Sequence, residues 1–146
     1  MNKLENWLDI LKGARILNAI AGGNFNGSVV VLEFEHNYSL TIQCVWRLSQ
    51  DNQVLASWNE KSNEIGSNFE SQISALKNDI IIEIEMSNLF DLNVKVSSGK
   101  MLQIFTDINQ FYSEDNFDEN WYLCNSSSNI CYGIKRLHSV VQSNYS

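Results

Sequence analysis

Two stretches of this 146-residue chain follow the same order of sequence patterns, and this constrains the fold more than any single motif does. The stretches cover approximately residues 3–58 and 67–124. Each begins with a short amphipathic helix pattern and continues with apolar, β-branched strand segments that are separated by turns. The sequence therefore predicts an α+β fold, in which two copies of a helix-plus-antiparallel-strands unit pack into a single domain over residues 1–146.

Apolar residues at helical spacing predict a helix over about 3–12, ended by Gly13, and a capping box at Ser67 and Glu70 predicts a second over about 68–77. Ile16 and Ile20 are expected on one face of a first strand. Further strands are expected at 28–35, 38–48, 54–58, 79–86, 91–96, 101–106, 121–124 and within 130–141, with a frayed tail from residue 142. The segments 28–48 and 91–106 each read as a hairpin.

The composition indicates a folded, acidic protein. Apolar residues make up 44% of the chain and aromatic residues 11%, which argues against disorder. The formal net charge of −7 makes nucleic acid an unsuitable ligand, because binding to phosphates requires a basic surface. The same charge favours a basic partner, which it attracts over roughly a Debye length. No segment has the length and apolarity of a membrane span, so no membrane contact is expected.

The cysteines and the N-terminal segment bear on the cellular compartment. Cys44, Cys124 and Cys131 form an odd set without CxxC spacing, which favours reduced thiols. A bridge from Cys124 to Cys131 across a hairpin is the alternative. The N-terminal segment also lacks the pattern of a secretory signal. The sequence therefore predicts a cytoplasmic protein.

Sequence motifs of cofactor binding and catalysis are missing. The chain contains no GxxxxGK[ST], GxGxxG, HExxH or GxSxG pattern. Its histidines, His36 and His138, are far apart in sequence, and no spacing pairs either with a cysteine as nucleophile and base. We therefore expect a binding protein that is not an enzyme, with no cofactor and no metal.

One acidic segment, residues 107–120, stands out. Its second half carries four carboxylates in eight residues, and aromatic residues flank it. One interpretation is a solvated loop whose aromatic residues, such as Phe111 and Trp121, turn inward. The other is a surface that binds a basic partner. A metal site is not expected, because the run lacks the glycine and the distal glutamate of an EF-hand loop. The candidate partner-binding residues are Asp107, Tyr112, Glu114, Asp115, Phe117, Asp118, Glu119 and Tyr122.

A family resemblance rests on the strand pair 91–94 and 99–105 and on the later Asn120-Trp121-Tyr122-Leu123. These segments resemble small bacterial proteins that contain a duplicated α+β unit. Several such proteins act as immunity proteins in contact-dependent inhibition or related polymorphic-toxin systems. The resemblance covers roughly residues 4–123, and the first stretch departs from it at His36-Asn37, where the second has a glycine turn.

The resemblance implies neutralisation of a cognate toxin domain by a one-to-one protein complex, without catalytic residues. A nuclease is the expected toxin class, because nucleases are basic and an acidic inhibitor competes with their substrate. Two alternatives remain open. One is a small-molecule or anion-binding domain, or a minor enzyme, with a pocket between the repeats near Cys44, Trp46 and Arg47. The other is a structural subunit that self-associates through a sheet edge.

Overall fold

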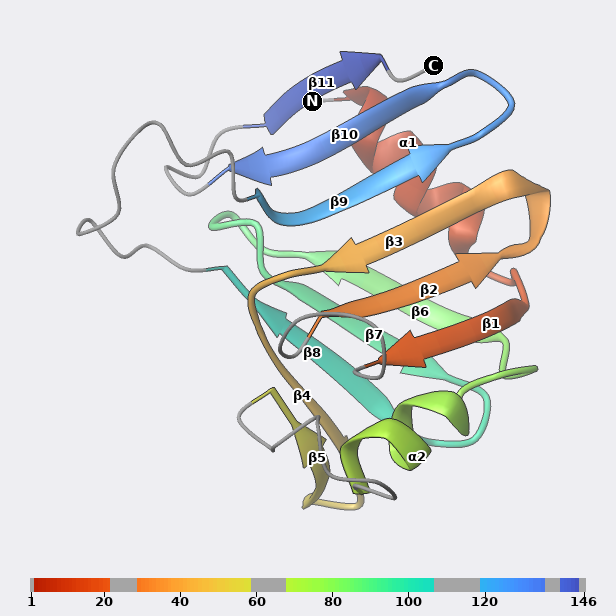
Figure 1. The fold of residues 1–146 in the computed structure, drawn as a ribbon, viewed down its shortest axis with the longest axis vertical. Helices are drawn as coiled ribbons and strands as arrows, with labels where there is room; N and C mark the ends of the chain where they lie inside the picture. Colours follow the sequence, from red (N-terminus) through yellow and green to blue (C-terminus); the bar gives the residue numbers. More distant parts are fainter. Residues whose placement is uncertain (1, 22–28, 59–67, 107–118, 136–139, 145–146) are drawn as a thin grey trace.

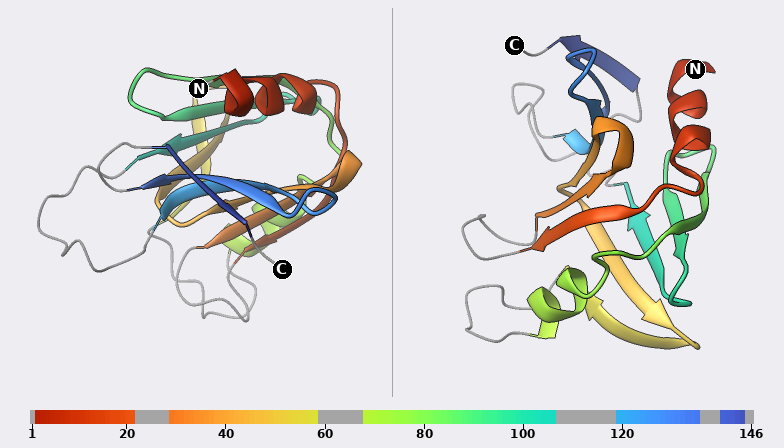
Figure 2. Two further views of the ribbon diagram at one scale, coloured as in Figure 1. Left: turned by 90° about the horizontal axis from the view of Figure 1, so that it is seen from above. Right: turned by 90° about the vertical axis from the view of Figure 1, so that its right-hand side faces the viewer.

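The computed structural model describes residues 2–21, 29–58, 68–106, 119–135 and 140–144. These residues form two antiparallel sheets and two α-helices, with most of the structure in strands (Figure 1). The predicted α+β class is confirmed. The sheets stack as two layers, and the helix α1 extends the second layer behind the upper strands of the first (Figure 2).

The helix α1 (Asn2–Leu11) packs one apolar stripe against the inner face of the first sheet. Leu4, Leu8 and Leu11 on this stripe are buried, as their spacing predicts. Trp7 makes edge-on ring contacts with Tyr38 and Tyr132, at centroid distances of 5.4 and 4.7 Å. The helix α2 (Asn68–Ser74) contacts β1 and β5, which are edge strands of the two sheets. The helices therefore cover the parts of the core that the sheets leave open.

The first sheet has six strands in the order β1-β2-β3-β9-β10-β11. A short 3-10 turn, η1 (Glu35–Asn37), joins β2 to β3, and His36 and Asn37 in it both have positive φ. The strand bounds are β1 (Ile16–Ala21), β2 (Val30–Phe34), β3 (Tyr38–Ile42), β9 (Glu119–Asn125), β10 (Ile130–Lys135) and β11 (Val140–Asn144). Residues 142–144, expected to fray, thus belong to β11, because their backbone pairs with β10, and residues 145–146 lie outside the described residues.

The second sheet has five strands in the order β5-β4-β8-β7-β6. Its strands are β4 (Val45–Gln50), β5 (Gln53–Ser57), β6 (Ile81–Met86), β7 (Leu92–Val96) and β8 (Met101–Phe105). The hairpins β2–β3 and β7–β8 confirm the two hairpins that the sequence predicts. A bridge between Arg15 and Ile80 connects the chain after α1 to the start of β6.

The single strand expected over 38–48 is wrong. The chain leaves β3 after Ile42 and enters the other sheet as β4 at Val45, so that Ile42 lies opposite Trp121 and Val45 opposite Phe105. In the same way, β9 leaves the second stretch and pairs with β3. Each sheet therefore contains strands from both stretches, and the two do not pack as separate units. That they are copies of one unit stays a prediction.

The core between the layers contains two fully buried tryptophans, Trp46 on β4 and Trp121 on β9. Trp46 stacks on Phe69 of α2 at a centroid distance of 5.4 Å, and the Trp121 indole nitrogen donates a hydrogen bond of 2.9 Å to the Phe90 carbonyl. Each ring thus joins a strand to a neighbouring element. The indole nitrogen of a buried tryptophan usually donates a hydrogen bond, as it does at Trp121.

Candidate partner-binding surface

Most of the predicted partner-binding residues lie outside the described residues. These are Asp107, Tyr112, Glu114, Asp115, Phe117 and Asp118. Glu119 begins β9, and only its backbone is described. Tyr122 is placed fully: it lies half-buried on β9, between the core residues Trp121 and Leu123. Alternation along the strand therefore directs Tyr122 to the outer face of the six-stranded sheet.

The described residues on either side of the acidic segment are held by one turn, residues 87–91. Before the segment, Thr106 donates from its backbone nitrogen to the Asp91 carboxylate at 2.7 Å and from its hydroxyl to the Leu89 carbonyl at 2.8 Å. After the segment, Trp121 donates to the Phe90 carbonyl. The 87–91 turn therefore holds the residue before the acidic segment, Thr106, and the residue after it, Trp121.

This turn carries an unusual backbone conformation and an exposed leucine. Phe90 has a φ of 67°, a region that bulky residues rarely adopt. The Ser87 hydroxyl accepts hydrogen bonds from the backbone nitrogens of Leu89 and Asp91, at 3.2 and 3.1 Å. The Leu89 side chain is 61% exposed. An apolar side chain is thus presented on a well-bonded turn beside the ends of the acidic segment.

The outer face of the six-stranded sheet is the second feature of interest. In Figure 1 it is turned toward the viewer, and no described helix or strand lies in front of it. One row across it runs from Ile20 through Val31 and Thr41 to Tyr122, each directly opposite the next. Thr41 is buried between its neighbours, whereas Ile20 is 36% exposed. The row places an apolar band next to the predicted anchor Tyr122.

A β-bulge in β1 adds a second apolar side chain to this face. Ile16 lies opposite Phe34 and Asn18 opposite Glu33, so Leu17 is the extra residue. Ile16 and Ala19 consequently both face the core, while Leu17, 48% exposed, and Ile20 face outward. The expectation that Ile16 and Ile20 share one face is therefore wrong, because the bulge shifts the alternation by one residue.

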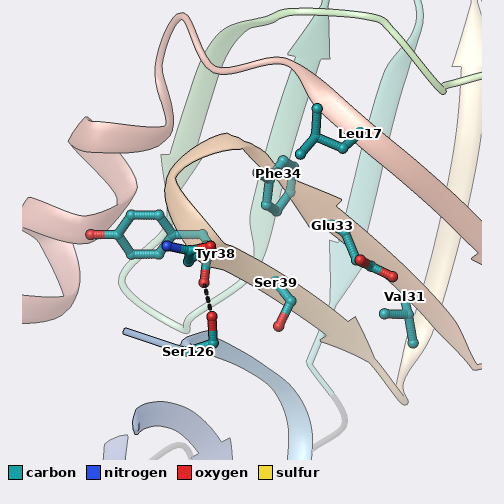
Figure 3. A pocket seen from close by; sticks show the side chains of 8 residues that line it. Leu17, Val31, Glu33, Phe34, Tyr38, Ser39 and Ser126 are labelled. Carbon is teal, nitrogen blue, oxygen red and sulfur yellow. Dashed lines mark hydrogen bonds between the residues drawn. The ribbon is translucent and has the colours of Figure 1, made fainter. Parts of the chain in front are cut away.

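A cavity of about 360 Å³ lies on this face at the β2–β3 turn (Figure 3). Its residues come from β1, from β2 and β3 with the turn that joins them, and from the turn after β9. In Figure 3, Leu17 and Phe34 lie on one side of it and Glu33 and Val31 on another, and Ser39 lies between Ser126 and Glu33. Among its lining residues, which include Ser126, Glu33 is the only charged one.

The cysteines correct the expectation of reduced thiols. Cys124 on β9 and Cys131 on β10 lie directly opposite each other, with Cα atoms 4.1 Å apart, and form a disulfide. Hairpin register produces this pair, which a count of cysteines could not show. The bridge lies beside Ser39 on the outer face of the six-stranded sheet. Cys44 is buried and takes no part in this disulfide.

The residues expected around a pocket between the repeats do not form one binding group. Trp46 is fully buried against Phe69, and Cys44 is buried. Arg47 is exposed on the opposite side of β4, where its guanidinium donates to the Gln103 side chain at 2.9 Å and lies 5.4 Å from the centre of the Phe105 ring. The five-stranded sheet therefore separates the Trp46 ring, on its core side, from the Arg47 charge on its outer face.

No metal-binding group of three or more acidic, histidine or cysteine side chains is found in the part of the chain that the structure describes. None of the described helices is long and apolar enough to cross a membrane. His36 lies in η1 as a turn residue, and His138 lies outside the described residues. Comparisons with protein-family models, with curated proteins and with solved structures found no match. The functional argument therefore rests on the residues of this chain.

Proposed function

We propose that this chain is an immunity protein that binds a cognate basic toxin domain and neutralises it in a one-to-one complex. The observation that carries the proposal is the outer face of the six-stranded sheet. It combines exposed apolar side chains with a carboxylate, and β9 connects it directly to the acidic segment. Apolar anchors surrounded by complementary charge are typical of surfaces that bind proteins.

The charge of the chain supports a basic partner. The net charge of −7 attracts a cationic protein and speeds its association. A nuclease is the proposed toxin class, because an enzyme that binds phosphates presents the basic surface that this chain complements. In the proposed complex, Asp107, Glu114, Asp115, Asp118 and Glu119 supply charge. Tyr112, Phe117 and Tyr122 supply aromatic contacts.

Leu89 is a further candidate for an apolar contact. It lies on the 87–91 turn, which is bonded to Thr106 and Trp121 at the two ends of the acidic segment. The hydrogen bonds of the turn fix the backbone at Leu89, so binding a partner here does not require the backbone to be ordered first. We therefore propose Leu89 as an apolar contact next to the charged one.

The test is calorimetric titration of the chain with the C-terminal toxin domain encoded beside it, at low and high salt. We expect tight one-to-one binding that weakens as salt rises. A variant with Glu114, Asp115, Asp118 and Glu119 changed to amides should associate more slowly and with a smaller salt dependence. The matched control changes four exposed carboxylates elsewhere, Glu5, Asp9, Asp51 and Glu85, to amides.

If the two four-residue variants lose the same amount of association rate, the net charge of the chain alone drives association. That result would contradict the assignment of the acidic segment as the binding surface. Absence of binding at either salt concentration would overturn the immunity function itself. Self-association of the chain in the same experiment, measured by light scattering, would instead favour a structural subunit.

A further inference from the structure

We infer that the cavity at the β2–β3 turn is a docking pocket for one arginine or lysine side chain of the protein partner, with Glu33 as its countercharge. The inference deepens the proposed function, and rests on it for the statement that the cation belongs to that partner. It is carried by the shape, charge and surroundings of the cavity.

The cavity has the size for a single large side chain. Its volume of about 360 Å³ lies at the lower end of the range of about 300–1,000 Å³ that is usual for ligand sites. Leu17, which the bulge in β1 directs outward, forms one wall, and Phe34 beside it is almost fully buried. These apolar groups, with Val31, suit the aliphatic stem of a lysine or arginine, whose charged end reaches a polar group.

The polar groups of the cavity favour a cation. Glu33 supplies its only charged lining group, and the ion pairs found among the described residues, Lys12–Asp9 and Lys95–Glu83, do not involve it. The Asn37 amide nitrogen already donates to the Ser127 hydroxyl at 2.8 Å, which leaves the Asn37 side-chain oxygen to accept. A carboxylate and an amide oxygen together match the donors of a guanidinium or ammonium group. An anion would meet repulsion at the same place.

The surroundings favour a side chain of a protein over a free small cation. Apolar surface continues from Val31 to Ile20, which lies directly opposite on β1 and is 36% exposed. In the other direction the same row leads through Thr41 to Tyr122. A partner whose basic side chain enters the cavity would therefore also cover this band, which adds burial of apolar area to the charge contact.

The experiment uses Nα-acetyl-arginine-N-methylamide as the probe and the citrulline analogue, which has the same shape without the charge, as its control. Amide NMR spectra of the full chain are recorded at increasing probe concentration. We expect the arginine probe to shift the backbone amide signals of Leu17, Val31 and Ser39, and the citrulline analogue to leave them unchanged. Glu33→Gln should weaken binding of the arginine probe up to about fivefold, the upper value for an exposed charge pair.

Glu85→Gln is the matched control, because it removes an exposed carboxylate from the other sheet. It should leave the binding of the arginine probe unchanged. Equal shifts with the citrulline analogue, unchanged binding in Glu33→Gln, or no shifts around the cavity would each overturn the inference. Since the probe requires no toxin, binding at Glu33 without binding of the toxin domain would leave the pocket in place and refute only the proposed function.

Discussion

The two sheets of this protein present outer faces of different chemistry. On the five-stranded sheet the charged side chains are engaged within the chain: Lys95 pairs with Glu83 at 3.6 Å, and Arg47 contacts Gln103 and Phe105. On the six-stranded sheet Glu33 borders an apolar band and a cavity, and the residues directly opposite it, Asn18 and Ser39, are both uncharged.

The comparison is sharpest at two equivalent cross-strand positions. Glu83 lies directly opposite Lys95, and Glu33 lies directly opposite Ser39. An exposed ion pair contributes only about 0–1 kcal/mol to stability, so the fold does not require a cation beside either carboxylate. Glu83 already has a cation opposite it, whereas Glu33 has an uncharged residue at the equivalent position, so its charge is open to a cation of a partner.

The largest effect is expected from the disulfide on the six-stranded sheet, for which the five-stranded sheet has no counterpart among the described residues. Cys124 and Cys131 are separated by seven positions in the sequence. Closing a loop of this size stabilises a protein by about 2–3 kcal/mol. Changing both residues to alanine should therefore lower the free energy of unfolding by about this amount, measured by urea denaturation.

Reductant provides the control for this prediction. It should destabilise the wild-type protein and leave the double variant unchanged. Equal stability of both proteins without reductant would show that the bridge does not form. Disulfides persist mainly in oxidising compartments, so rapid alkylation of thiols in freshly lysed cells also tests the cytoplasmic location that the sequence predicts.

The second-largest effect is expected from a change at Ser39, which lies opposite Glu33 as Lys95 lies opposite Glu83. Ser39→Lys should place a cation opposite Glu33 and reproduce the pair that Lys95 makes with Glu83. We expect it to weaken binding of the arginine probe up to about fivefold, because the countercharge is then occupied from within the chain. Stability should change by no more than about 1 kcal/mol.

Ser49→Lys on β4 is the matched change in the other sheet and should leave binding of the probe intact. Unchanged binding in Ser39→Lys would show that Glu33 does not hold the cation. A large loss of stability in Ser39→Lys, measured by urea denaturation, would mean that the outer face of the six-stranded sheet has no room for the lysine side chain. The two faces would then differ in side-chain packing and not in charge.

A smaller effect is expected from Arg47 on the five-stranded sheet. Its guanidinium lies 5.4 Å from the centre of the Phe105 ring and donates to Gln103. Arg47→Ala should cost about 0.5–1 kcal/mol, as expected for an exposed cation–π contact. Urea denaturation measures this, with Lys100→Ala as the control. A cost no larger than that of Lys100→Ala would show that this face is held by its backbone ladder alone.

The smallest effect is expected in the pKa values of two carboxyl groups on the same face, Glu83 and Glu85. A hydrogen bond from the Glu85 carboxyl to Glu83 lowers the pKa of Glu83, which Lys95 lowers further, and the same hydrogen bond raises the pKa of Glu85. Glu83 therefore favours folding above its unfolded pKa, and this contribution is lost as pH falls through the lowered folded value. Glu85 favours folding at low pH and loses that contribution as pH rises through its raised pKa.

Lys95→Gln should raise the pKa of both carboxyl groups, because it removes the cation that stabilises their charged forms. Carboxyl ¹³C titration by NMR measures both groups. Lys100→Gln is the control and should move neither. If the order of the two pKa values is reversed, or if Lys95→Gln has no effect, the pairing on this face is wrong.

Much of the fold follows from local patterns. The stripe of Leu4, Leu8 and Leu11 predicts α1, and the turn at Gly99 predicts the hairpin of β7 and β8. The strand expected over 38–48 fails because its two halves are both apolar and β-branched, and nothing local marks the crossing between sheets at Gln43 and Cys44. The Gln43 backbone nitrogen bonds there to the carbonyl of Asn120, a partner distant in sequence.

The candidate site was predictable only in part. Tyr122 is a half-buried aromatic residue on the outer face, as an anchor requires, and Trp121 next to it is core. Alternation along the strand 28–35 puts Glu33 on the face opposite to Leu32 and Phe34, but alternation cannot reveal a cavity on that face. The one signal was the run Ile16-Leu17, whose adjacent bulky residues are compatible with a bulge.

The sequence by itself determined the α+β class, the helices and hairpins, and the acidic charge, since these depend on periodicity and composition over short windows. Only the tertiary structure decided the exchange of strands between the sheets, the pairing of Cys124 with Cys131, and the contrast between Glu33 and Glu83. The physical reason is that cross-strand register decides which side chain lies opposite another. Register depends on pairing between segments that are far apart in the chain.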